Sequence, residues 1–246
     1  MNNNLLSRVS IILVEPAGEL NVGSVARIMK NMGLANLILV NPQCDFKSNS
    51  ARLMAVHAGD ILDRAIVVDS LEKALQGHHR AIATTARSRS VNTPLETPRV
   101  ALPWLLIDNL KSALIFGPED RGLSNIELAY AQRFVCIPAN PEYPSLNLAQ
   151  AVAVCAYELY QANISAEVIP KTAIVPAPIE QLEGYYQDLQ QLLLKIGYLY
   201  PHTVESRMEK FRRLYNRNSL SSEEVAMLRG IIRQVNWAIN SEGAER

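Results

Sequence analysis

Short apolar runs alternate with amphipathic segments along the first two thirds of the chain. Because these runs are continuously apolar, they are typical of strands that are buried on both faces of a sheet. The segments between them carry apolar residues at helical spacing, which predicts an α/β domain with a parallel sheet and helices on both faces. The six expected strands are Val9–Val14, Leu37–Val40, Ile66–Val68, Ala81–Thr84, Ala113–Phe116 and Phe134–Ile137.

Three of the expected strands run into loops that carry glycine, proline or polar residues. These loops are Thr84–Ser90, Gly117–Ser124 and Ile137–Asn147. The carboxyl ends of parallel strands meet at one edge of a sheet, and ligands bind at that edge in open α/β folds. Three prolines restrict the backbone of the third loop, so it has little freedom to lose when a ligand binds. Taken alone, each loop fits a rigid turn without a ligand equally well.

Two helices border these loops. Val25–Met32 has helical periodicity, and Asn21 is placed to cap the helix. Gly23, Arg27 and Lys30 are expected to share its exposed face, where solvation alone would account for both cations.

A second helix is expected at about 147–161, with Ser145 as its cap. This helix is rich in Ala and Val, and its outer surface is a candidate subunit interface. Packing within a single core would explain its composition equally well.

The composition changes after residue 162. We expect one domain at 1–162, a linker with several prolines at 163–177, and a helical extension at 178–246. The extension has three amphipathic segments, the last of which opens with Ser221 and Glu224 as a capping box. Its middle segment holds Arg207, Lys210, Arg212 and Arg213 beside aromatic residues. This basic segment fits a contact with an RNA backbone, and a solvated amphipathic helix fits it about as well.

Charge and cysteine content limit the partners and the compartment. The 24 Lys and Arg residues balance the 24 Asp and Glu residues, so a nucleic acid would have to be held by a local patch. The three cysteines lack Cys-x-x-Cys spacing, which predicts a reduced protein without a disulfide framework or a zinc site. No run approaches the roughly 18 apolar residues of a membrane span. We therefore expect a soluble, cytoplasmic protein with no membrane partner.

Several familiar active sites are excluded by their missing motifs. The chain has no Gly-x-x-x-x-Gly-Lys phosphate loop and no Gly-x-Gly-x-x-Gly after the first strand. Its four histidines have no metal-ligand spacing, and none lies in the three loops, so we expect neither a metal nor a Ser–His–Asp hydrolase. Backbone amides, hydroxyls and nearby arginines remain. They suit a neutral or zwitterionic cofactor next to a substrate that carries phosphate.

Three stretches in this order resemble the motifs of one enzyme group. Asn21–Arg27, Gly117–Gly122 and Pro144–Ala149 are similar to the motifs of the SPOUT superfamily, specifically its SpoU/TrmH-like ribose 2′-O-methyltransferases. Asn140–Tyr143 and the helical extension are most similar to the tRNA (cytidine/uridine-2′-O-)-methyltransferases. The resemblance implies a SPOUT fold with a C-terminal trefoil knot that binds S-adenosylmethionine. It also implies a homodimer with shared active sites, and a substrate nucleotide in the tRNA anticodon loop rather than in DNA.

The resemblance also assigns residues. It places eight around the cofactor, namely Thr84, Thr85, Ala86, Gly117, Ile137, Pro144, Ser145 and Leu146. Arg27 would face the ribose and stabilise the developing negative charge, with Asn21, Ser145 and Asn147 ordering the site. The cations expected to hold RNA are Arg87, Arg89, Arg207, Lys210, Arg212 and Arg213. A non-catalytic RNA-binding protein of the same fold and a ribosomal RNA ribose methyltransferase are the alternatives.

Overall fold

A computed structural model describes residues 5–86, 94–165, 174–216 and 219–242 of the chain. The chain divides into two compact units, Met1–Thr172 and Ala173–Arg246. The expected linker at 163–177 spans this boundary, and its central part lies outside the described residues.

A parallel sheet of seven strands forms the centre of the first unit. The strand order is β3-β2-β1-β6-β4-β7-β5, and every neighbouring pair is parallel. The expected parallel sheet is therefore confirmed. The strands are β1 (Val9–Val14), β2 (Asn36–Val40), β3 (Ile66–Val68), β4 (Arg80–Thr84), β5 (Leu95–Glu96), β6 (Ser112–Phe116) and β7 (Arg133–Val135).

The sheet has one strand more than the sequence predicted. β5 is only two residues long and lies in a segment with several prolines, so it shows no periodicity of its own. It exists because β7 offers it a free edge, where the Cys136 amide donates to the Glu96 carbonyl at 2.9 Å. β7 itself ends at Val135, two residues earlier than expected.

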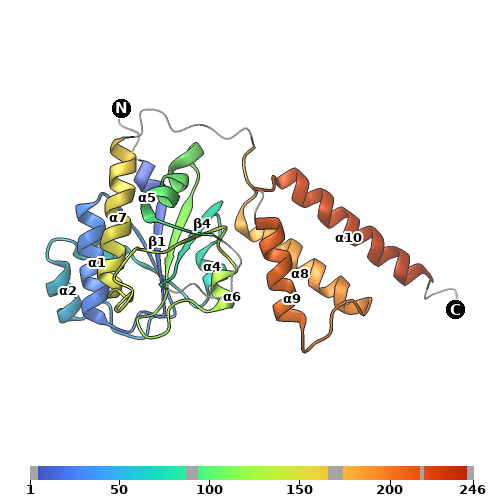
Figure 1. The fold of residues 1–246 in the computed structure, drawn as a ribbon, viewed down its shortest axis with the longest axis horizontal. Helices are drawn as coiled ribbons and strands as arrows, with labels where there is room; N and C mark the ends of the chain where they lie inside the picture. Colours follow the sequence, from blue (N-terminus) through green and yellow to red (C-terminus); the bar gives the residue numbers. More distant parts are fainter. Residues whose placement is uncertain (1–4, 87–93, 166–173, 217–218, 243–246) are drawn as a thin grey trace. The chain divides into compact units, whose positions relative to one another are not determined.

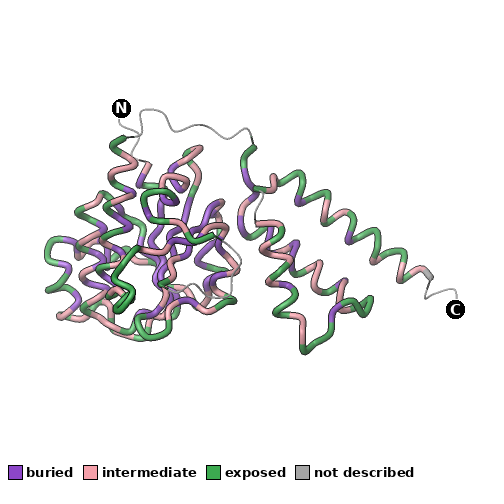
Figure 2. Tube along the Cα trace, in the orientation of Figure 1, coloured by how far each residue is buried: buried purple, intermediate pink, exposed green. Residues whose placement is uncertain are grey.

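Helices cover both faces of the sheet, as expected (Figure 1). Ile11 and Leu13 of β1 belong to a buried cluster with Val22, Val25 and Val152, which come from helices of one layer. The sheet residues are buried, and exposed residues lie on the outer sides of the helices (Figure 2). The helices of this unit are η1 (Leu5–Arg8), α1 (Glu19–Asn31), α2 (Asn49–Ala55), α3 (Gly59–Arg64), α4 (Leu71–Ala74), α5 (Pro98–Ala101), η2 (Leu102–Asn109), α6 (Asn125–Leu128) and α7 (Leu148–Ile164).

The face of α1 that carries Gly23 is buried rather than exposed. A Cβ atom on Gly23 would lie 2.2 Å from the carbonyl oxygen of Ala51, so α2 crosses α1 at this glycine. Lys30 is paired with Asp60 of α3 at 2.7 Å. The side chain of Arg27 is exposed and makes no ion pair or hydrogen bond with any residue that the structure describes. The expectation of one solvated face is therefore wrong for Gly23, because α2 packs there, and no local pattern signals that contact.

The residues that were expected to cap α1 and α7 are not the N-caps of these helices. α1 begins at Glu19 with Gly18 as its N-cap, so Asn21 lies inside the helix. α7 is capped by Asn147, whose side-chain oxygen accepts from the amide of Ala149 at 2.9 Å. Ser145 lies two residues before that cap. Both side chains that were expected to cap a helix are therefore left for other contacts.

The second unit contains three helices and its own core. They are α8 (Ile179–Lys195), α9 (Val204–Asn216) and α10 (Ser222–Glu242). Tyr185, Tyr186 and Leu192 of α8 are buried with Met208 of α9 and Val225 of α10. The predicted capping box of α10 is confirmed, because the Ser221 amide donates to Glu224 at 2.7 Å and the Glu224 amide donates back to the Ser221 hydroxyl.

Within the described residues, no helix combines the length and the apolar composition that are needed to span a membrane. Cys44, Cys136 and Cys155 are all free thiols.

The α1–α2 contact generates a stability prediction. Gly23→Ala should lower the free energy of unfolding of the first unit by about 1–3 kcal/mol, because the backbone of Ala51 has no room for a methyl group. Hydrogen exchange of peptides from α1 would measure the change. Gly230→Ala in α10 is the matched control, since nothing lies within 4 Å of the added methyl. There the helix should be stabilised by about 0.5–1 kcal/mol. Unchanged protection of α1 in Gly23→Ala would contradict the packing argument.

Candidate functional site

A cavity of about 140 Å³ lies at the carboxyl ends of β4, β6 and β7. Described residues from all three loops that the sequence singled out form its walls. All eight residues that were expected to surround a cofactor line this one cavity: Thr84, Thr85, Ala86, Gly117, Ile137, Pro144, Ser145 and Leu146. Arg87 and Arg89, from the same loop as Thr84, lie outside the described residues.

The walls of the cavity are tied to the sheet by short contacts. The Thr84 hydroxyl donates to the Ile115 carbonyl at 3.0 Å, and the Thr85 amide donates to the Val135 carbonyl at 2.9 Å. At Gly117 a Cβ atom would lie 2.3 Å from the backbone nitrogen of Leu123. The second loop therefore closes on itself, and only glycine fits at its start.

Asn21 joins the second and third loops through its side-chain amide. Its Nδ2 donates to the Glu119 carboxylate at 2.8 Å, and its Oδ1 accepts from Nδ2 of Asn147 at 2.9 Å. Glu119 also accepts from the backbone amides of Ala17 and Gly18, at 3.2 and 3.3 Å, at the start of α1. The sequence singled out Asn21 and Asn147 for the site, but no role was assigned to Glu119, because its partners lie about 100 residues away.

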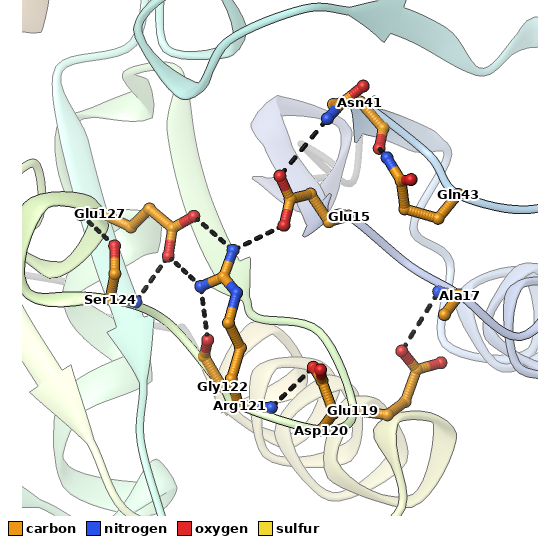
Figure 3. A network of polar contacts seen from close by, with 10 residues as sticks. All are labelled: Glu15, Ala17, Asn41, Gln43, Glu119, Asp120, Arg121, Gly122, Ser124 and Glu127. Atoms are coloured by element: carbon orange, nitrogen blue, oxygen red, sulfur yellow. Dashed lines mark hydrogen bonds and ion pairs between the residues drawn. The ribbon is translucent and has the colours of Figure 1, made fainter.

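Arg121 holds the second loop from the other side (Figure 3). Its guanidinium donates to Glu15 at 2.6 Å, to Glu127 at 2.9 Å and to the Gly122 carbonyl at 3.0 Å. Burial would raise the pKa of Glu127, but hydrogen bonds from Arg121 and from Ser124 outweigh burial, so this pKa lies below its usual value. The two carboxylates in turn raise the pKa of Arg121. Arg121 thus lines the cavity with its charge already balanced.

Glu15 adopts an unusual backbone conformation where β1 ends. Its φ is +47°, in the left-handed region that few residues other than glycine occupy. The carboxylate accepts from Arg121 with one oxygen and from Asn41 with the other, at 3.3 Å. Strained residues of this kind persist where surrounding contacts hold them, and they cluster at functional sites. Glu15 was not predicted from the sequence, since nothing in its local pattern signals this conformation.

Arg27 and Ser145, two residues that the motifs assign to the site, are both exposed. Arg27 lies on α1, six residues after Asn21, and is not part of the cavity lining. Ser145 lines the cavity and is itself exposed. An exposed guanidinium without a partner among the described residues suits an anionic group of a substrate. Among the described residues, no group of three or more His, Cys, Asp and Glu side chains is placed to hold a metal ion.

Two of the four cations of α9 form ion pairs, and the other two have none within the described residues. Arg212 forms an ion pair with the buried Glu183 of α8, and Arg213 pairs with an acidic residue of its own helix. Arg207 and Lys210 are exposed, and their side chains have no ion pair within the described residues. The proposed RNA contact therefore rests on Arg207 and Lys210. The sequence could not make this distinction, because it does not show that α8 places a carboxylate beside Arg212.

Family models match both units of the chain. The SpoU rRNA Methylase family matches residues 8–157, and the C-terminal domain of the tRNA methyltransferase TrmJ matches residues 180–244. The tRNA (cytidine/uridine/adenosine-2′-O-)-methyltransferase TrmJ of Pseudomonas aeruginosa is 41% identical over 243 residues, which cover 93% of each chain. The tRNA (cytidine/uridine-2′-O-)-methyltransferase TrmJ of Pectobacterium atrosepticum is 41% identical over 236 residues, covering 94% of this chain and 98% of the relative.

A solved structure of a related protein supports the same family. The crystal structure of TrmJ from Z. mobilis is 34% identical and superimposes with a TM-score of 0.83, covering 92% of this chain and 98% of that one. The resemblance seen in the three sequence motifs is thereby confirmed over nearly the full length. The chain belongs to the SpoU methylase family, and it carries the C-terminal domain of the TrmJ tRNA methyltransferases.

Proposed function

We propose that this protein transfers a methyl group from S-adenosylmethionine to the ribose 2′-hydroxyl of cytidine or uridine in tRNA. The observation that carries the proposal is that the second and third family motifs line one cavity and that Asn21 of the first motif is hydrogen-bonded to both of them. The nearly full-length similarity to tRNA 2′-O-methyltransferases supports tRNA as the substrate class. The target nucleotide lies in the anticodon loop, as the motif resemblance implies.

The cavity fits the methyl donor chemically. Phe116, Val135 and Leu148 give it an apolar lining for an adenine ring, and the loops supply backbone amides and hydroxyls for polar groups. Gly117 keeps this wall free of a side chain. When bound, S-adenosylmethionine supplies an electrophilic methyl group on a sulfonium. Thr84, Ser145 and Leu146 belong to the residues that would hold it.

Arg27 orients the nucleotide and stabilises the charge that develops on the 2′-oxygen. A guanidinium is a poor proton acceptor, so Arg27 does not act as a general base. It binds the phosphate next to the target ribose, and the 2′-hydroxyl proton leaves to a phosphate oxygen or to water. Because methyl transfer is an in-line displacement, positioning supplies much of the acceleration. Asn21, Asn147 and Ser145 keep the rim of the site ordered.

The enzyme works as a homodimer. Arg27 does not line the cavity of its own chain, so a second copy is well suited to bring its Arg27 to that cavity. Exposed apolar side chains on α7, among them Val154, Tyr157, Tyr160 and Ile164, give a second copy a surface to cover.

The enzyme acts in the cytoplasm on tRNA.

The C-terminal part of the first unit is knotted. β7 lies between β4 and β5 in the sheet, although it follows both of them in the sequence. In the proposed knot, the segment after β7 is threaded through a loop of the chain before α7 begins. This threading is one of the rare exceptions to unknotted topology.

Mass spectrometry of nucleosides tests the function directly. After incubation with methyl-labelled S-adenosylmethionine, tRNA should contain labelled 2′-O-methylcytidine or 2′-O-methyluridine. Ribosomal RNA in a parallel reaction should stay unlabelled. Label in ribosomal RNA alone would favour the alternative ribosomal enzyme, and no label in either RNA would favour a non-catalytic RNA-binding protein.

Arg27→Ala tests the role of the free guanidinium. We expect turnover to fall about 100-fold or more, as when one group that stabilises a developing oxyanion is lost. The affinity for S-adenosylmethionine, measured by calorimetry, should be unchanged, because Arg27 does not line the cavity. Arg64→Ala, an exposed arginine on α3, serves as the control and should keep its activity. Wild-type turnover in Arg27→Ala would refute the assigned role.

Two substitutions of Asn147 separate its two contacts. Asn147→Asp keeps the oxygen that caps α7 but has no donor for Asn21, so helix stability should be retained while turnover falls about tenfold. Asn147→Ala removes both contacts and should also cost about 1 kcal/mol of stability. Thermal unfolding and steady-state kinetics measure the two effects. If Asn147→Asp has full activity, the link to Asn21 does not order the site.

A further inference from the structure

The turn between α8 and α9 exposes three rings, which we call the aromatic turn: Tyr198, Tyr200 and His202. The side chains of Tyr198 and Tyr200 are 54% and 57% exposed. The ring of Tyr200 stacks on His202, with centroids 5.9 Å apart and an angle of 21° between the planes. Tyr198 contacts Phe211 of α9, with centroids 6.5 Å apart. The rings thus form two pairs, one within the turn and one that reaches α9.

The aromatic turn is held rigidly by its backbone. Gly197 ends α8 with φ at +74°, a conformation that favours glycine. The amides of Tyr198 and Leu199 both donate to the Leu193 carbonyl at 3.0 Å. Leu199 is buried in the core of the unit, so the tyrosines on either side of it are directed outward. Exposure of the two rings is therefore built into the turn.

Two cations lie on α9 close in sequence to Phe211, the ring that Tyr198 contacts. Arg207 and Lys210 lie three residues apart on α9 and share a side of the helix, and Arg207 is one turn before Phe211. Both side chains are exposed, and neither has an ion pair with another described residue. Glu205 lies two residues before Arg207 and so faces a different side of α9. α9 therefore presents two positive charges near Phe211, while Glu209 of the same stretch is paired with Arg213.

We propose that the aromatic turn is a stacking platform for unpaired bases of tRNA, and that Arg207 and Lys210 hold the adjacent phosphates. This inference rests on the proposed function and names the part of the second unit that recognises the substrate. Exposed aromatic rings beside cations are the recurrent solution for binding single-stranded RNA, since bases stack on the rings while the cations follow the backbone. The chain has no net charge that could hold RNA elsewhere by a general field.

The chemistry of the surface defines the RNA that it takes. Rings accept a base only when the base is not stacked within a duplex, so the platform binds loops and single strands and not a continuous helix. Its contribution appears in the affinity for tRNA and in the KM for tRNA. The affinity for S-adenosylmethionine and the turnover at saturating tRNA do not depend on it.

Substitution of Tyr200 in the full chain tests the platform. Tyr200→Leu should weaken tRNA binding about fivefold or more, whereas Tyr200→Phe, which keeps the ring, should bind within about twofold of the wild type. Fluorescence anisotropy with labelled tRNA at several salt concentrations measures both. Tyr200→Leu should leave the salt dependence unchanged, while Arg207→Gln should lower its logarithmic slope by about one.

The control is Trp237→Leu, which removes an exposed aromatic side chain of α10 that is 64% exposed. It should bind tRNA as the wild type does. An equal loss in Trp237→Leu and Tyr200→Leu would overturn the platform, because general surface hydrophobicity would then explain the effect. Wild-type affinity for tRNA in Tyr200→Leu would overturn the platform as well.

The two proposals fail in different ways. If the wild-type protein methylates tRNA and Tyr200→Leu binds tRNA normally, the platform is refuted and the proposed function stands. If the wild-type protein leaves tRNA unmethylated while Tyr200→Leu still loses affinity for it, the proposed function is refuted and the platform stands.

Discussion

The side-chain amide of Asn21 connects parts of the site that are far apart in the sequence. Its nitrogen donates to Glu119 of the second loop, and its oxygen accepts from Asn147 at the start of α7. An amide is the side chain that offers a donor and an acceptor in one fixed plane, so both contacts also fix its orientation. Because Asn147 caps α7 with its own oxygen, the same bonds set where α7 begins relative to α1. The rim of the cavity depends on this connection.

Some cations of the chain form ion pairs that hold the fold, and others have no ion pair among the described residues. Arg121 forms ion pairs with two carboxylates, and Arg212 forms one with the buried Glu183 of α8. Arg27, Arg207 and Lys210 are exposed, and their side chains are unpaired among the described residues. Pairing removes a cation from the set available to phosphate, since its hydrogen-bond donors are already used. A chain with zero net charge can therefore still present local positive sites to RNA.

Rigidity of the loops and exposure of the cations complement each other. The second loop is closed at Gly117, held by Arg121 on one side and anchored through Glu119 on the other. A preformed cavity loses little conformational entropy when a small cofactor binds. An RNA substrate is larger and less constrained, and the contacts proposed for it come from exposed side chains on α1 and α9. The two kinds of surface therefore suit the two partners that the proposed reaction requires.

The sequence by itself determined the six main strands, the three loops at one edge and the capping box at Ser221, because each depends on residues that are close along the chain. It also singled out Asn21, Arg27 and Asn147 through their motifs. Only the tertiary structure decided that Asn21 bridges two loops instead of capping α1, that Gly23 admits α2, and that Arg212 is paired with α8. Periodicity and capping are properties of consecutive residues. A hydrogen bond or ion pair between distant segments depends on where the whole fold brings them, and no local pattern records that.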